Sequence, residues 1–326
     1  MHASSVPTAV RPLLKWAGGK RQLLPALRQY YPVHFERYLE PFVGSGAVFF
    51  DLFSLGRLDG VPATLTDVNV DLVGTYRTVR DRTEEVLRVL AGLDRDHRRD
   101  GDACYYQVRD RRFNPLRQAT MADGPLAALD AYPVELAAMF IYLNRTGFNG
   151  LFRLNRSGQF NVPAGRYADP RICDADHLRA VAAAFRRSRA QIEFSPFDAM
   201  LAGAGRGDFI YCDPPYAPLS PTANFAHYTA GGFSASDQLR LRDAIVAACR
   251  RGAVVIESNS SAPSIEEAYR SAAAKRVQLK VDRVPARRAI NSRASARGPV
   301  DEFIISNVKK RMAKADLPTA RRAGVA

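Results

Sequence analysis

The chain has 326 residues, 47% of them hydrophobic, which is enough for one large α/β domain with a buried core. Its 47 lysine and arginine residues against 33 acidic ones give a net charge of +14, which favours a polyanionic partner, nucleic acid before an anionic membrane surface. The four cysteines form no CxxC pair, and no apolar run approaches the roughly 18–20 residues of a membrane span, so we expect a cytoplasmic protein without a zinc site, a disulfide framework or a membrane anchor.

The first predicted elements form the start of a βαβ unit. In chain order they are a loop over 13–20, a short helix around 23–27, a strand over 38–42, a helix over 47–55 and a strand over 63–67.

A mainly helical segment, 71–172, then interrupts the alternation of strands and helices. We expect helical structure over 71–92, a charged loop over 96–102, helices from 105 to 142 broken at Pro115, Pro125 and Pro133, a polar glycine-rich stretch over 144–150 and a hairpin over 152–162.

The alternation resumes after a predicted helix over 176–186. Strands are predicted over 191–195, 207–212, 253–258, 276–284 and 302–308, with a helix over 236–250. The simplest architecture is an α/β fold with one doubly wound sheet, formed by 1–70 and 173–308, into which 71–172 is inserted. The basic tail, 309–326, has little apolar content and is expected to be disordered.

The most informative motif is Asp213-Pro214-Pro215-Tyr216, at the end of the predicted strand 207–212. Prolines donate no backbone N–H, so the carbonyls of this turn remain acceptors beside a carboxylate and an aromatic face. An exocyclic amine on a flat heterocycle offers the complement, two N–H donors and a π-face. The motif therefore predicts a site for such an amine, and the plainer interpretation is a proline-rich turn with Tyr216 in the core.

The segment Glu40-Pro41-Phe42-Val43-Gly44-Ser45-Gly46 lies where a predicted strand turns into a helix. Glycines allow a ligand to approach the backbone closely, and a helix start offers free N–H groups. Phe49 stands where a dinucleotide site has its third glycine. Asp67 ends the next strand about 20 residues on, where an acid can bind ribose hydroxyls. Together they indicate a nucleoside-containing cofactor, with a tight turn and helix cap as the alternative.

The segment Lys15-Trp16-Ala17-Gly18-Gly19-Lys20 contains the only tryptophan. Leu14 and Arg21 stand where a phosphate loop needs Gly and Ser or Thr, so ATP binding is not indicated. Trp16 either packs in the core or shields an adenine or a sulfonium, because cations favour aromatic faces. Lys20 either neutralises a ligand carboxylate or is a solubilising surface lysine.

In this order the motifs resemble DNA adenine methyltransferases of the Dam type. The resemblance covers about 12–308 and extends through Tyr142–Arg145, Asn149–Leu151, Asn161–Pro163, Tyr211–Ser220 and Ala223–Phe225. It implies a Rossmann-like, S-adenosylmethionine-dependent methyltransferase sheet with an inserted, mainly helical target-recognition domain, 71–172. It also implies methylation of the exocyclic amine of adenine in double-stranded DNA, usually at GATC.

The resemblance implies roles for individual residues. The catalytic residues are Asp213, Pro214 and Tyr216. Trp16, Lys20, Asp67 and Asp213 match the family's cofactor residues, and Glu40, Phe42, Gly44 and Gly46 complete the expected cofactor site. The residues expected to contact bases or to insert into the duplex as a wedge are Lys15, Phe148, Asn149, Leu151, Arg153 and Pro163. Arg287, Arg288, Arg293 and Arg297 are expected to hold phosphates.

Two of these DNA roles have plainer alternatives. For Phe148 the alternative is a place in the core of the insert, and for Arg153 it is a contact to a phosphate or an ion pair instead of guanine. The chain also departs from the family at Phe148, where Tyr is common, at Ser260, where His often follows Ser258-Asn259, and over 115–133, which looks longer.

The implied mechanism begins with flipping the adenine out of the duplex. Tyr216 stacks on the flipped ring, while the Asp213 carboxylate and the Pro214 carbonyl accept its two N–H bonds. No metal is required, and we expect a monomer acting on DNA in a bacterium or phage-infected cell, associated with the nucleoid. The rivals are methylation of another amine (cytosine N4 in DNA, adenine in RNA or glutamine in protein) and a decayed, non-catalytic DNA-binding protein.

Overall fold

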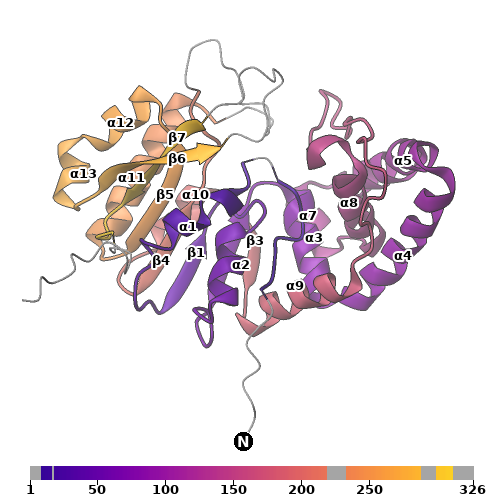
Figure 1. Cartoon of the computed structure of the whole chain (residues 1–326), viewed down its shortest axis with the longest axis horizontal. Coiled ribbons are helices and arrows are strands. Elements are labelled where there is room, and N and C mark those ends of the chain that lie inside the picture. The colour runs from indigo at the N-terminus through magenta and orange to yellow at the C-terminus, as the bar shows by residue number, and fades with distance from the viewer. Residues whose placement is uncertain (1–8, 17, 219–232, 288–298, 311–326) are drawn as a thin grey trace, which may run out of the picture.

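The computed structural model describes residues 9–16, 18–218, 233–287 and 299–310 (Figure 1). In this part of the chain a seven-stranded sheet has the order β3-β2-β1-β4-β5-β7-β6. Its strands are β1 (Arg37–Glu40), β2 (Ala63–Asp67), β3 (Gln191–Phe194), β4 (Asp208–Cys212), β5 (Val254–Ser260), β6 (Lys280–Arg287) and β7 (Pro299–Ser306). The first five are parallel, and β7 pairs antiparallel with both β5 and β6. The order reverses between β1 and β4, the place where α/β sheets bind ligands at the carboxyl ends of their strands.

Helices cover both faces of the sheet, because successive residues of each buried strand point to opposite sides. Tyr38 of β1 packs into a core with α1 (Leu24–Leu27), α2 (Ala47–Ser54) and α9 (Ala175–Arg187). Leu39 packs into a second core with α10 (Phe197–Ala202), α11 (Ala235–Arg250), α12 (Pro263–Tyr269) and α13 (Ala272–Arg276). The predicted doubly wound sheet is therefore confirmed.

The helical segment forms a lobe beside the sheet, at the far side from β6 and β7 (Figure 1). Its helices are α3 (Val70–Asp81), α4 (Thr83–Asp100), α5 (Asp102–Gln107), α6 (Asn114–Thr120), α7 (Pro125–Asp130) and α8 (Val134–Thr146), with a π-helical turn at Val108–Phe113. The three prolines mark helix starts, since Pro115 and Pro125 lie in the first turns of α6 and α7 and Pro133 is the N-cap of α8. Proline is tolerated there because the first N–H groups of a helix have no intrahelical partner.

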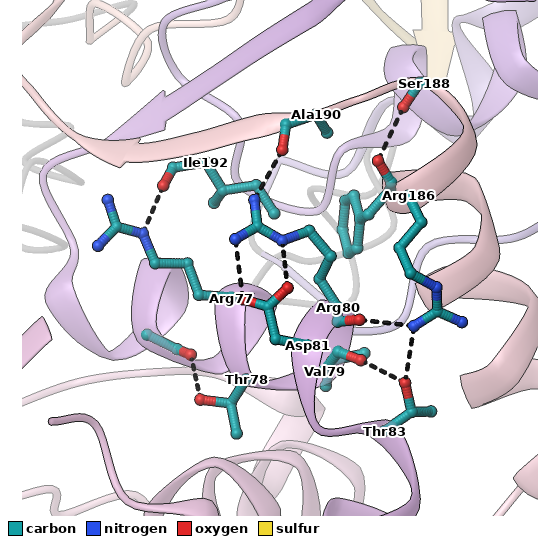
Figure 2. A network of polar contacts seen from close by, with 12 residues as sticks. Arg77, Thr78, Val79, Arg80, Asp81, Thr83, Arg186, Ser188, Ala190 and Ile192 are labelled. Carbon is teal, nitrogen blue, oxygen red and sulfur yellow. Dashed lines mark hydrogen bonds and ion pairs between the residues drawn. The ribbon is translucent and has the colours of Figure 1, made fainter. Parts of the chain in front are cut away.

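Arginines join this lobe to the edge of the sheet (Figure 2). Arg77 Nε of α3 donates to the Ile192 carbonyl at 2.6 Å, and a terminal nitrogen of Arg80 donates to the Ala190 carbonyl at 2.8 Å. Arg186 of α9 donates to the Arg80 carbonyl at 2.6 Å. Because charged donors make the stronger hydrogen bonds, these contacts fix α3 against β3 and α9.

The helical structure predicted over 71–92 is confirmed, in two helices, whereas the charged loop predicted over 96–102 is wrong. The chain turns at Arg82 between α3 and α4, and α4 remains helical through Asp100, which includes most of the predicted loop. Its charges pair along the helix, as with Arg98 and Asp94 at 3.2 Å. Pairs three or four residues apart support a helix, so a high density of mixed charge does not exclude one.

Three other predicted elements are shorter than expected or have different bounds. The predicted hairpin over 152–162 is reduced to one antiparallel bridge, Leu154 with Phe160. The strand expected over 276–284 begins at Lys280 because α13 ends at Arg276 and the chain then turns, with Gln278 at a φ of +61°, and the strand expected over 302–308 is Pro299–Ser306. The remaining predicted strands and the helices over 47–55, 176–186 and 236–250 are confirmed within about three residues.

Candidate active site

The carboxyl ends of the central strands gather the predicted catalytic and cofactor residues. Asp213 follows β4, Glu40 ends β1, Asp67 ends β2, and Ser258 belongs to the end of β5. Lys20 reaches this edge from the short 3-10 turn Lys20–Gln22 that precedes α1. Parallel strands place their carboxyl ends at one edge of a sheet, so residues far apart in sequence meet here.

Asp213 is held by a lysine and a serine. Lys20 Nζ lies 2.8 Å from Asp213 Oδ1, and Ser258 Oγ donates to the same oxygen at 3.1 Å. The hydroxyl of Tyr211 in turn lies 2.9 Å from Ser258 Oγ. Burial raises the pKa of Asp213, and the neighbouring Lys20 ammonium opposes that rise. The lysine thus favours the ionised, accepting form of the carboxylate.

Tyr216 presents its ring to the same ammonium. Lys20 Nζ lies 4.5 Å from the centre of the Tyr216 ring, within the range of a cation–π contact. The Tyr216 hydroxyl donates to Glu302 Oε2 of β7 at 2.7 Å, which fixes the ring at its far end. Lys20 Nζ therefore contacts both the Asp213 carboxylate and the face of the Tyr216 ring. Lys20 is buried, so it is not a solubilising surface lysine.

The turn from β1 into α2 adopts the backbone conformation that its glycines allow. Gly44 and Gly46 have φ of +46° and +66°, in the left-handed region that disfavours other residues. A Cβ added at Gly44 would lie 2.9 Å from Cδ1 of Trp16. Gly44 N donates to Asp67 Oδ2 at 3.1 Å, which ties the turn to the end of β2. Burial raises the pKa of Asp67 to about 6.

The other expected cofactor residues, Trp16, Glu40 and Phe42, each make a different kind of contact. Trp16 stacks against Phe152 with ring centroids 6.2 Å apart, so it packs on the aromatic cluster of the lobe while it also faces Gly44. Glu40 is buried, accepts from the Tyr38 hydroxyl at 2.9 Å, and has a pKa raised well above its ordinary value by burial. Phe42 stacks on Phe197 at 5.5 Å, which points to a packing role.

The loop that carries Trp16 and Lys20 is bound to the glycine-rich end of α8. The Asn144 side chain accepts from Lys15 N at 2.9 Å and donates to the Lys15 carbonyl at 2.7 Å and the Gly150 carbonyl at 2.9 Å. Lys15 Nζ lies 4.2 Å from the centre of the Tyr167 ring. The expected cofactor loop and the expected DNA-reading loop therefore form one connected surface.

The expected DNA-contacting residues lie mostly on this surface. Phe148 is 46% exposed, so it is not part of the insert core, and its N–H donates to the Pro163 carbonyl at 2.9 Å. Asn149 has a left-handed backbone (φ +54°), and Leu151 packs partly against the core. Exposed Arg153 donates from Nε to Asn161 Oδ1 at 2.8 Å.

The expected phosphate contacts lie at and beyond the end of β6. The backbone of Arg287 pairs with Pro299 of β7. Arg288, Arg293, Arg297 and the tail from residue 311 lie outside the described residues.

The family follows from a comparison with known proteins. A family model described as D12 class N6 adenine-specific DNA methyltransferase matches residues 16–283. The chain belongs to this family. It is accordingly an adenine-specific DNA methyltransferase.

Relatives of this D12 methyltransferase are similar over nearly the whole chain. Type II methyltransferase M1.LlaDCHI of Lactococcus lactis subsp. cremoris is 36% identical over 298 residues, covering 91% of this chain and 95% of that protein. Type II methyltransferase M.MjaIII of Methanocaldococcus jannaschii is 35% identical, covering 77% and 84%. The DNA adenine methylase of Escherichia coli K12 is 34% identical over 294 residues, covering 90% and 94%.

Sequence reasoning missed two residues that support the candidate site. Glu302, which fixes Tyr216, lies 86 positions further along the chain. Asn144 was part of the matched segments, yet nothing in its neighbours indicated that it holds the loop at Lys15. Among the described residues there is no group of three His, Cys, Asp or Glu side chains placed to hold a metal, and no helix there is long and apolar enough to cross a membrane.

Proposed function

We propose that this methyltransferase transfers a methyl group from S-adenosylmethionine to N6 of a flipped adenine in double-stranded DNA, within GATC. The observation that carries the proposal is the position of Lys20 Nζ, 2.8 Å from the Asp213 carboxylate and 4.5 Å from the centre of the Tyr216 ring. A nitrogen donor already satisfies, in the protein alone, the two contacts that the target amine needs.

The amine would take the place of the ammonium on the Tyr216 ring, while Lys20 keeps its contact with Asp213 Oδ1. The N6 group of adenine is, like the ammonium, an N–H donor, and its ring offers a face to Tyr216. The Pro215 carbonyl already accepts from Gln238 Nε2 at 2.9 Å, so the carbonyl assigned to the second N–H is that of Pro214. Bonds from both N–H groups to Asp213 and Pro214 draw the nitrogen away from conjugation with the ring and free its lone pair. They also stabilise the positive charge that develops on it.

The residues at the ends of β1 and β2 fit the cofactor. Gly44 has no room for a Cβ against Trp16, so a side chain there would displace the indole. Asp67 offers a half-buried acceptor for ribose hydroxyls, and Glu40 ends the neighbouring strand at the same edge of the sheet. When bound, S-adenosylmethionine supplies an electrophilic methyl group on a sulfonium. Trp16 would shield that cation from water.

Cofactor affinity should therefore depend on the pH near 6. The ionised Asp67 is the form that accepts hydroxyl hydrogen bonds, and its pKa is raised to about 6, so affinity falls as the pH falls through this value. Well below it the loss approaches about tenfold per pH unit, and above pH 7 affinity is flat. Titration followed by the fluorescence of Trp16, the only tryptophan, measures this. Asp67→Asn should bind weakly at pH 8 and show no such slope; an unchanged slope would assign the titration to another group.

The exposed loop beside this site supports duplex recognition. We infer that Phe148 fills the space left by the flipped base and that Lys15, Asn149, Leu151, Arg153 and Pro163 line the DNA. The segment 71–172 would then be the target-recognition domain, with Arg287 and Arg288 on phosphates. Arg153 uses Nε on Asn161, and its terminal nitrogens would bind a guanine edge.

Replacing Arg153 tests base reading separately from DNA binding. Arg153→Ala should lower discrimination at one base pair by about 1–3 kcal/mol, because a bidentate contact to guanine is lost. Methylation rates on GATC and on duplexes altered at each position measure the effect. Arg156→Ala, an exposed arginine of the same loop, is the matched control and should weaken all sequences alike. If Arg153→Ala also weakens all sequences alike, Arg153 is a phosphate contact.

The family assignment favours adenine in DNA over cytosine, RNA and protein amines. The chain would act as a monomer in the bacterial or phage-infected cytoplasm on the nucleoid, with or without a partner restriction enzyme. Sequencing modified bases in DNA from a methylation-deficient host that expresses the chain tests the proposal. N6-methyladenine confined to GATC supports it, and the same modification in another sequence would reject GATC.

A further inference from the structure

A chain of buried polar side chains lies behind the Asp-Pro-Pro-Tyr turn. The Glu257 carboxylate of β5 accepts from Asn259 Nδ2 at 2.8 Å and from the hydroxyl of Tyr269. Asn259 Nδ2 also donates to Gln238 Oε1 at 3.0 Å. Gln238 Nε2 of α11 donates to the Pro215 carbonyl at 2.9 Å. A buried carboxylate is thus connected through two amides to the backbone of the turn.

The carboxylate fixes the direction of each bond in this chain. An ionised carboxylate only accepts, so Asn259 turns its NH2 group toward Glu257 and its oxygen toward the N–H groups of Ala217 and Ser260. Gln238 receives the other N–H of Asn259 on its oxygen and must present its own NH2 to Pro215. Reversing either amide would place donor against donor or acceptor against acceptor in a site where Asn259 is fully buried.

The same group of residues holds the turn at several backbone atoms. Besides the Pro215 carbonyl, the Ala217 N–H lies 3.4 Å from Asn259 Oδ1, and the Ala217 carbonyl accepts from Ser260 Oγ at 2.7 Å. The two prolines contribute no N–H of their own, so side chains from β5 and α11 must fix this turn. Tyr216 lies between the two held peptides, and Asp213 and Pro214 directly precede them.

We propose that Gln238 is a positioning residue for methyl transfer, with Asn259 and Glu257 fixing the direction of its amide. The inference rests on the proposed function. Gln238 does not touch the amine: it acts through the Pro215 peptide, setting where the Pro214 carbonyl and the Asp213 carboxylate meet the nitrogen. It also occupies the Pro215 carbonyl, which would otherwise compete for the amine.

Gln238→Glu tests the positioning role, because the two side chains have nearly the same size and shape. The new carboxylate still accepts from Asn259, but it opposes the Pro215 carbonyl with an acceptor and displaces the turn. The single-turnover methylation rate should fall roughly 10- to 100-fold, the cost of a small misplacement of reacting groups. Dissociation constants for S-adenosylmethionine and for a GATC duplex should stay within threefold. Assays at pH 8 keep Glu257 ionised, since burial raises its pKa to about 7.

Asn307→Asp is the matched control. Asn307, after β7, holds the backbone at the opposite end of β5, accepting from Val255 N at 2.9 Å and donating to the Ala253 carbonyl at 2.9 Å. The same amide-to-acid change there removes one donor to a backbone carbonyl far from the turn. It should lower the melting temperature about as much as Gln238→Glu and leave the methylation rate unchanged.

The outcomes separate positioning from stability. Gln238→Leu, which removes the donor without adding charge, should also lose rate and keep both dissociation constants. A wild-type rate in Gln238→Glu, an equal rate loss in Asn307→Asp, or loss of the fold in both Gln238 variants would overturn the inference. A wild-type protein that leaves adenine unmethylated would instead reject the proposed function itself.

Discussion

Asp213→Ala is expected to abolish methyl transfer while the protein still binds its ligands. The substitution removes the acceptor that lies 2.8 Å from the nitrogen at the site assigned to the amine. Losing one preorganised electrostatic contact at a reaction centre costs on the order of 10²–10³-fold in rate, and here the Pro214 carbonyl alone would remain. Single-turnover methylation of a GATC duplex measures the loss. Dissociation constants for S-adenosylmethionine and DNA should stay within an order of magnitude.

The control for Asp213→Ala is Ser258→Ala, which removes one hydrogen bond to the carboxylate and leaves the acceptor in place. It should lose much less rate, because the Lys20 contact to Asp213 remains. Near-wild-type turnover in Asp213→Ala would show that the carboxylate is not part of the chemistry.

Lys20→Met should produce the second largest loss, and the loss should depend on pH. Lys20 is the cation that opposes the raised pKa of the shielded Asp213 carboxyl, so removing it raises that pKa further. A protonated Asp213 loses accepting capacity, so the rate should fall most at low pH, by no more than the roughly 10²–10³-fold cost of losing this contact. The methylation rate of the variant should rise again as the pH rises, because Asp213 ionises again. A pH–rate profile of the variant beside the wild type measures this.

Two variants separate the charge of Lys20 from its position. Lys20→Arg keeps a cation near Asp213 and should keep the wild-type acidic limb of the profile. Lys15→Met removes a lysine of the same loop whose ammonium lies instead on Tyr167, and it should leave the limb unchanged. A Lys20→Met profile parallel to the wild type at every pH would show that Lys20 does not set the protonation of Asp213.

The central strands and the candidate site at their ends could be predicted from sequence because each signal is local. A buried apolar run followed by Asp213, or by Asp67, places the carboxylate at the end of a strand, and parallel strands then bring these ends together. Gly44 and Gly46 indicated a strand-to-helix turn, and in the structure both have positive φ.

The supporting residues could not be predicted, since nothing local distinguishes them. Gln238 is one polar position in an amphipathic helix, and its role exists only because α11 packs behind the turn. Glu302 belongs to an antiparallel strand whose register with β5 decides that it meets Tyr216. The charged end of α4 was misjudged for another reason: composition alone does not reveal that its charges pair along one helix.

The most direct test of the account is transfer from labelled S-adenosylmethionine to matched duplexes by the purified chain. One duplex contains GATC, one has its adenine replaced by purine, which lacks the N6 amine, and others carry altered sequences or cytosine targets. The account predicts label on N6 of the GATC adenine and none on the purine duplex. Label on cytosine or RNA while every adenine stays unmarked would contradict it.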